Sequence, residues 1–280
     1  ESLWYRVNPG LALGYQDIEG LRQLAREGAT SITARETFRQ YNLNVWLDHS
    51  TDPFIEMSIY DRGDRPLPAD IDRLPCWIGV DMSVTTDLTA VVACVRKDDD
   101  FLILPFFFCP RDNLRARADR DGVPYPEWAE QGYITPTVGN VIDYRAVEAC
   151  IRGLCERFDV QEINFDKAYA NPVMGPLNDD GYLVATLQQG WVTQSPALNE
   201  LERVIMAGHF VHAGHPVLRW CFANVAIRTD SSGNRVMHKG KSTDRIDGAV
   251  ATWMAVSRAA AAESRSMYDR EDWSDAMGFF

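Results

Sequence analysis

The chain has 280 residues, of which 46% are hydrophobic and 11% are aromatic, and its formal net charge is −12 at pH 7. This composition is typical of a globular protein with a substantial core, and it excludes a largely disordered chain. The apolar runs are far shorter than the ~20 residues that cross a bilayer, and the first residues lack the pattern of a signal peptide, so we expect a cytoplasmic protein with no membrane partner.

The N-terminal quarter lacks the strand rhythm of the rest of the chain. Helices are predicted at residues 18–27 and 33–41, the second because Thr33 and Glu36 have the spacing of a capping box. Residues 62–68 contain two prolines and a glycine, which disfavour both helix and central strand, so a linker is expected there. Residues 1–70 are therefore interpreted as a connecting segment that ends in a linker.

Residues 71–262 are predicted to form one α/β domain. Three apolar runs rich in β-branched and aromatic residues, at 76–82, 89–96 and 101–108, predict an antiparallel meander. Helical and strand patterns then alternate, which favours parallel strands added beside the meander and flanked by helices. The predicted helices are 145–158, 172–179, 195–207 and 243–261, the added strands are 162–166 and 183–187, and a hairpin is expected at 226–229 and 234–238.

The C-terminal segment, residues 263–280, carries five acidic residues, two arginines and several aromatics. Two interpretations remain open for this tail: it is disordered, or it is a docking peptide for a partner protein.

Cysteines and histidines do not indicate a metal site of their own. None of the six cysteines forms a Cys-x-x-Cys pair, so buried free thiols are expected. His209, His212 and His215 recur every three residues, but the neighbouring glycines and Pro216 break the helix that a zinc site with this spacing would need. We expect His212 to be structural.

Three aspartates are the candidate catalytic and metal-binding residues. Asp81 lies inside an apolar strand, Asp166 ends a later strand, and Asp247 lies near the start of the last helix. A carboxylate among apolar strand residues is costly unless something neutralises it, and hard cations such as Mg²⁺ or Mn²⁺ prefer oxygen ligands. Three carboxylates can hold two such ions for phosphodiester hydrolysis, so we expect the three to cluster at one edge of the sheet.

Asp166 and Asp247 also have a structural interpretation, because each could simply stabilise a helix N-terminus. Asp87 and Asp244 are further acidic candidates that would lie outside the direct ligands, and a turn residue explains Asp87 equally well.

One stretch reverses the acidic character of the chain. Residues 217–245 contain six basic and two acidic residues, so this stretch could face phosphates. The candidate DNA-binding residues are Arg235, Lys239, Lys241 and Arg245.

In order along the chain, these motifs resemble the nuclease domain of terminase large subunits from tailed bacteriophages, which package viral DNA. The resemblance covers roughly residues 76–260 and rests on Ile78–Asp81, Asp87–Ala90, Asn140–Tyr144, Phe165–Asp166, Leu198–Arg203 and Ser242–Ala249. Residues 1–62 also resemble the stretch that joins the family's ATPase domain to its nuclease, notably residues 38–44.

The resemblance implies an RNase H-like fold and a metal-dependent endonuclease that cuts concatemeric double-stranded DNA during packaging. It implies two Mg²⁺ or Mn²⁺ ions held by Asp81, Asp166 and Asp247. It also implies the small terminase subunit and the portal or procapsid as partners, in the cytoplasm of an infected or lysogenic bacterial host.

One departure from the family pattern is that the chain has no Gly-x-x-x-x-Gly-Lys-Ser/Thr motif. Gly240-Lys241-Ser242 imitates its end, but Arg235 stands where the first glycine is required. We therefore expect the ATPase half to be absent from this chain. Two alternatives stay open: another RNase H-like nuclease of the resolvase or integrase type, and a non-catalytic docking module of the packaging motor.

Overall fold

The protein is described from a computed structural model that covers residues 1–30, 32–44, 53–82, 88–112, 114–166, 171–238 and 245–268. Within these ranges the side chains of 30, 32, 33, 36, 171, 172 and 263–268 are not described. Among the helices in these ranges, none combines the length and the hydropathy that a bilayer crossing requires.

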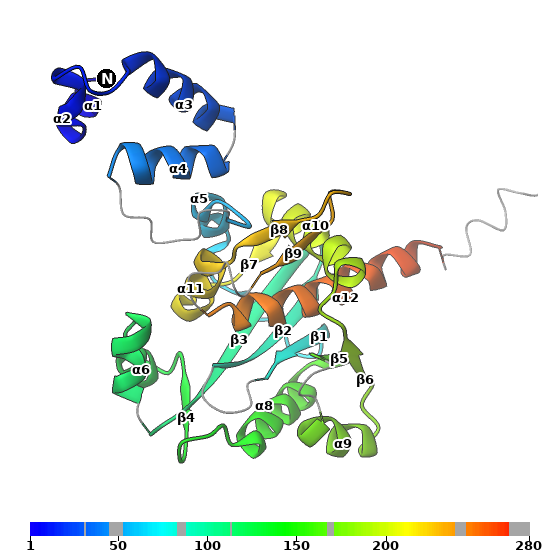
Figure 1. The fold of residues 1–280 in the computed structure, drawn as a ribbon. Coiled ribbons are helices and arrows are strands. Elements are labelled where there is room, and N and C mark those ends of the chain that lie inside the picture. Colours follow the sequence, from blue (N-terminus) through cyan, green and yellow to red (C-terminus); the bar gives the residue numbers. More distant parts are fainter. Residues whose placement is uncertain are drawn as a thin grey trace, which may run out of the picture.

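The N-terminal segment forms a small helical unit beside the sheet (Figure 1). Its helices are α1 (Ser2–Val7), α2 (Pro9–Ala12), α3 (Ile18–Thr30) and α4 (Ile32–Asn42). Leu11, Leu21 and Phe38 form its apolar cluster, with Trp4 in edge contact with Phe38. The two helices predicted here are confirmed, each with somewhat different ends.

The meander predicted from the sequence is confirmed by three long strands, β1 (Pro75–Asp81), β2 (Thr89–Lys97) and β3 (Asp100–Pro110). Within the described ranges, the main sheet has seven strands in the order β4-β3-β2-β1-β5-β6, with β7 paired to β3. The four added strands all run parallel to their neighbours: β4 (Thr135–Thr137), β5 (Asp159–Asp166), β6 (Val184–Leu187) and β7 (Phe210–Val211).

Helices cover both faces of this sheet and divide the core into two clusters. On one face, α8 (Tyr144–Arg157) buries Val147, Ile151 and Leu154, and α9 (Asn171–Asp179) packs beside it. On the other face lie α10 (Trp191–Met206), α11 (Pro216–Asn224) and α12 (Asp247–Tyr268). In Figure 1, α12 crosses the middle of the sheet, with α8 below it.

The approach of α12 to β1 depends on a glycine. A Cβ on Gly79 would lie 2.0 Å from the carbonyl oxygen of Ala251, so only glycine lets the helix backbone come this close to the strand. Ala249, Ala251 and Ala255 are fully buried along the same helix.

Several short elements were not predicted from the sequence. These are α1, α2, α5 (Met57–Tyr60), the 3-10 helix η1 (Asp61–Gly63), α7 (Tyr125–Glu130), β4, β7 and α11. A further helix is α6 (Leu114–Asp121), and the predicted hairpin is confirmed as β8 (Ile227–Thr229) and β9 (Arg235–Met237).

The predicted limits of the last helix were wrong at both ends. Arg245 and Ile246 are not helical, so the described helix begins at Asp247 rather than at 243, and it continues to Tyr268 rather than 261.

Candidate functional site

Asp81 is the last residue of β1 and is 1% exposed. Side chains alternate between the two faces of a strand, so Asp81 shares a face with Gly79. Because Gly79 lies against Ala251 of α12, Asp81 points to the face that α12 covers.

Asp166 is the last residue of the neighbouring strand β5. The two strands are parallel, and their register ends with Val80 opposite Phe165, so the next position on each strand is Asp81 and Asp166. Glu162, on the same face of β5 as Asp166, forms an ion pair with Arg258 of α12 at 2.8 Å. Asp166 is therefore on the α12 side of the sheet as well.

Asp247 is the first residue of α12 and is 9% exposed. Along the helix, Arg258 lies against Glu162 and Ala251 lies against Gly79, so the helix runs toward the carboxyl ends of β1 and β5 as its residue numbers decrease. Asp247, one turn before Ala251, lies at that end. The register of two strands and the course of one helix thus bring all three elements to one edge.

The side chains of these three aspartates do not form a compact metal site in the structure. Among the described residues, no group of three or more His, Cys, Asp or Glu side chains is placed so that it could hold a metal ion together. Within that part of the chain, Oδ2 of Asp81 and Oδ2 of Asp247 are buried atoms that accept no hydrogen bond, although both residues have other interactions. The donor set of carboxylate oxygens has the chemistry that suits a hard divalent cation.

Asp166 has a partner that the sequence pattern did not indicate. Nε2 of Gln189 donates a hydrogen bond to Oδ2 of Asp166 at 2.7 Å. Gln189 lies in the polar loop between β6 and α10, and no spacing rule connects such a residue with a carboxylate on another strand.

The other candidate residues divide into two groups. Asp87, Lys239, Lys241 and Asp244 lie outside the described residues. The two candidate DNA-binding arginines are described, and both are in ion pairs within the protein. Nη2 of Arg235 contacts Glu202 at 2.6 Å, and Nε of Arg245 lies 3.5 Å from Asp121.

His212 and His215 both make hydrogen bonds within the protein, in keeping with the structural role expected for His212. Its Nε2 lies 3.0 Å from the carbonyl oxygen of Tyr60, its Nδ1 accepts from the amide of Gly214, and its ring stacks on Tyr60. Nδ1 of His215 accepts from the amide of Leu218 and so caps α11. Burial lowers the pKa of both rings, that of His215 to about 4. All six cysteines are free thiols.

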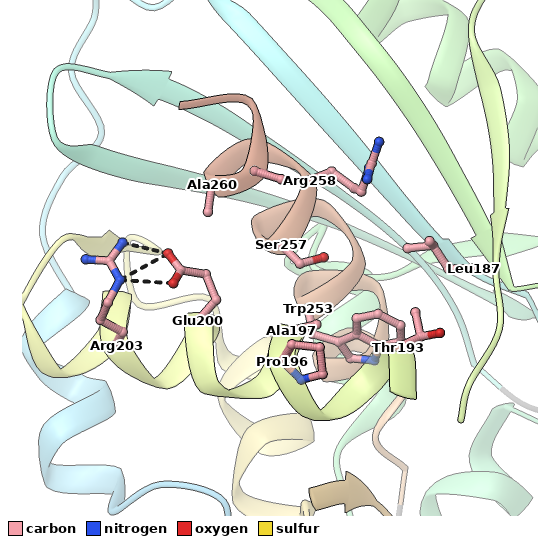
Figure 2. A pocket seen from close by; sticks show the side chains of 11 residues that line it. Leu187, Thr193, Pro196, Ala197, Glu200, Arg203, Trp253, Ser257, Arg258 and Ala260 are labelled. Carbon is pink, nitrogen blue, oxygen red and sulfur yellow. Dashed lines mark hydrogen bonds and ion pairs between the residues drawn. The ribbon is translucent and has the colours of Figure 1, made fainter. Parts of the chain in front are cut away.

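A cavity of about 580 Å³ lies between α10 and α12, beside the end of β6. Figure 2 shows Pro196, Ala197 and Trp253 together in it, with the ion pair between Glu200 and Arg203 to one side. Leu187, which also lines the cavity, is the register partner of Asp166. The cavity therefore adjoins the edge at which the aspartates lie.

Comparisons with known proteins give one consistent result. Residues 1–263 match the family described as terminase large subunit, endonuclease domain. Over 260 residues the chain is 32% identical to the large terminase subunit of Enterobacteria phage HK97. This aligned region covers 91% of this chain and 51% of that protein. It is 27% identical over 279 residues to Protein YmfN of Escherichia coli (strain K12), covering 95% of this chain and 60% of that protein.

A solved structure is also similar. The crystal structure of the HK97 bacteriophage large terminase has a TM-score of 0.68 and 30% sequence identity to this chain, and the match covers 92% of this chain and 53% of that one. The chain thus spans about half the length of the curated relatives it matches.

Proposed function

The chain belongs to the family of terminase large-subunit endonuclease domains, whose RNase H-like fold it shares, and from that premise we propose that it is a metal-dependent endonuclease. Its proposed substrate is concatemeric double-stranded viral DNA, which it cuts during genome packaging. The small terminase subunit and the portal or procapsid are its proposed partners, in the cytoplasm of a bacterial host.

The observation that carries this proposal is the parallel register of β1 and β5. The position after the last register pair is an aspartate on each strand, Asp81 and Asp166. Both lie on the face where α12 begins with a third aspartate. Carboxylates at adjacent strand ends repel one another, the more so because Asp81 is buried, and bound cations would relieve that repulsion. In the proposed site, Asp81, Asp166 and Asp247 hold two Mg²⁺ or Mn²⁺ ions.

The protein's own residues have defined tasks in this proposal. The two strands fix the backbone of Asp81 and Asp166, so that little reorganisation is needed when substrate arrives. The α12 helix, locked against Gly79, fixes Asp247. When bound, two divalent ions supply the Lewis acidity that activates water for attack and neutralises charge on the leaving oxygen.

A non-catalytic docking module is the second candidate, and one observation favours it. Among the described residues, the acidic side chains form no compact group able to hold a metal. In that case the fold would serve only as a platform in the packaging motor.

A plasmid-nicking assay with Mg²⁺, Mn²⁺ or EDTA separates the two candidates. We expect wild-type protein to nick with either metal and to lose activity in EDTA. Asp81→Asn should reduce nicking by more than the roughly 10- to 100-fold that loss of an outer hydrogen-bond partner costs. Its urea midpoint should not fall, because removing one negative charge relieves repulsion.

Asp159→Asn is the matched control, since Asp159 is exposed at the opposite end of β5. Full activity in Asp81→Asn, or activity in EDTA, would refute the proposed site. Absence of nicking in the wild type would favour the docking module. A preference for branched over linear DNA would instead favour a resolvase-type nuclease.

A further inference from the structure

The loop between β6 and α10 ends at the same edge as the aspartates. Strand β6 runs parallel to β5 with Leu187 opposite Asp166, so Gln189, two residues beyond Leu187, lies past the carboxyl end of β5. From there its amide donates to Oδ2 of Asp166 at 2.7 Å. A carboxylate only accepts hydrogen bonds, so the amide must present its nitrogen to it.

The backbone around Gln189 is held on both sides. The amide of Gly190 donates to the carbonyl of Gln188, and the amide of Gln194 donates to the carbonyl of Gly190 at 2.8 Å, which starts α10. The side chain of Gln194 is buried and accepts from the amide of Met237 at 2.7 Å, which ties this end of α10 to the β8–β9 hairpin. The contact of Gln189 with Asp166 therefore comes from a fixed segment.

We propose that Gln189 is a positioning residue that orients the carboxylate of Asp166 for binding a divalent cation. This inference rests on the proposed function, because it needs Asp166 to be a metal ligand. A carboxylate has enough lone pairs to accept the amide hydrogen bond and to coordinate a cation at the same time.

The chemistry of the amide group suits this task. Glutamine is neutral, so it fixes the carboxylate without cancelling the negative charge that attracts the cation. A lysine or arginine at this position would neutralise Asp166 and compete with the cation, and a glutamate would repel the carboxylate. Among the uncharged side chains, an amide on a two-carbon stem supplies both the N–H donor and the reach across the loop.

The test measures Mn²⁺ binding directly, by electron paramagnetic resonance titration of the full chain without DNA. Gln189→Ala should bind Mn²⁺ about 10- to 100-fold more weakly than wild type, which is the usual cost of losing an outer partner of a metal ligand. Gln188→Ala is the matched control, because Gln188 is the exposed neighbour in the same loop, and it should bind as wild type does.

A second variant guards against a folding defect. Gln189→Met keeps the length and volume of the side chain but removes the donor, so it should weaken Mn²⁺ binding as Gln189→Ala does, with an unchanged urea midpoint. The Mg²⁺ concentration for half-maximal nicking should rise in parallel with the loss of Mn²⁺ affinity. A merely structural role would lower the urea midpoint and leave the metal affinity of the folded protein unchanged.

Asp166→Asn distinguishes failure of this inference from failure of the proposed function. If Asp166→Asn loses Mn²⁺ but both Gln189 variants bind it as tightly as wild type, Gln189 is not a positioning residue and the proposed function stands. If wild type binds no Mn²⁺, or Asp166→Asn binds it unchanged, the metal site and this inference both fail.

Discussion

At the scale of single residues, His215 gives the protein a dependence on pH that is separate from the aspartate site. Its ring caps α11. The ring centroid lies 5.4 Å from that of Phe107 and 5.0 Å from that of Tyr133, and His212 is a neighbour. Burial and the neighbouring histidine lower its pKa from 6.5 to about 4. As the pH falls, His215 is protonated in the unfolded chain at a higher pH than in the folded protein. The contribution of the neutral His215 ring to the free energy of unfolding is therefore present above pH 6.5 and is lost as the pH falls toward 4.

We predict that His215 alone makes the protein about 2 kcal/mol less stable at pH 5 than at pH 7. The matched variant is His215→Asn, which does not titrate and whose side-chain oxygen can still cap the helix. Urea denaturation at both pH values should show a clearly smaller loss for this variant. An equal loss in variant and wild type would show that His215 does not titrate as its burial indicates.

At the scale of elements, α6 is tied to the start of α12. The side chain of Asp121, 6% exposed at the end of α6, accepts from Arg120 at 2.6 Å and from the hydroxyl of Tyr125 at 2.9 Å, and it contacts Arg245 just before α12. Burial by itself would raise the pKa of Asp121, but these hydrogen bonds and the arginine charges lower it. The helix that carries Asp247 is thus anchored from a distant part of the chain.

We predict that Asp121→Asn destabilises the protein by about 1–3 kcal/mol, because charge-assisted hydrogen bonds of a buried carboxylate are lost. Asp119→Asn, at an exposed position of the same helix, should change stability by less than about 0.5 kcal/mol. Urea unfolding of both variants measures the difference. The anchoring role is wrong if the two variants lose the same stability.

At the scale of the whole molecule, the proposed DNA binding by so acidic a protein requires a local surface. The net charge of −12 repels a polyanion, and Arg235 and Arg245 are each in an ion pair with a carboxylate. The other two proposed contacts are Lys239 and Lys241, which precede Asp247 in the sequence. Each phosphate contact releases counterions, so it contributes to the dependence of affinity on salt.

We predict that the double variant Lys239→Ala/Lys241→Ala lowers the slope of log affinity against log salt by roughly 1.8, or about 0.9 for each lysine. Its Mn²⁺ affinity should not change, because in this proposal the two lysines would contact the DNA backbone and not the ions. Lys97→Ala is the control, since Lys97 pairs with Asp70 at the opposite edge of the sheet. DNA titrations at several salt concentrations measure this slope. An unchanged slope for the double variant would contradict the prediction.

The sequence by itself determined the long elements of this protein. Strands β1 to β3 are near-continuous apolar runs because both sheet faces are covered, and α8 has the spacing of a half-buried helix. Each of these elements can therefore be predicted from its own residues. Asp81 stood out for the same reason, as a lone charge in a buried strand. Elements of two to six residues, such as β7 and α7, are too short for any period to appear and form where tertiary contacts hold them.

Only the tertiary structure decided which side chains meet. The contacts of Gln189 with Asp166 and of Arg245 with Asp121 join residues far apart in the chain, and local propensity carries no information about such pairs. The same limit applies to the three aspartates. Their residue types indicated the chemistry, and a common edge was expected from that chemistry. What brings the three elements to one edge is the parallel register of β1 and β5 and the glycine that admits α12, because strand pairing and close backbone packing are properties of the folded chain.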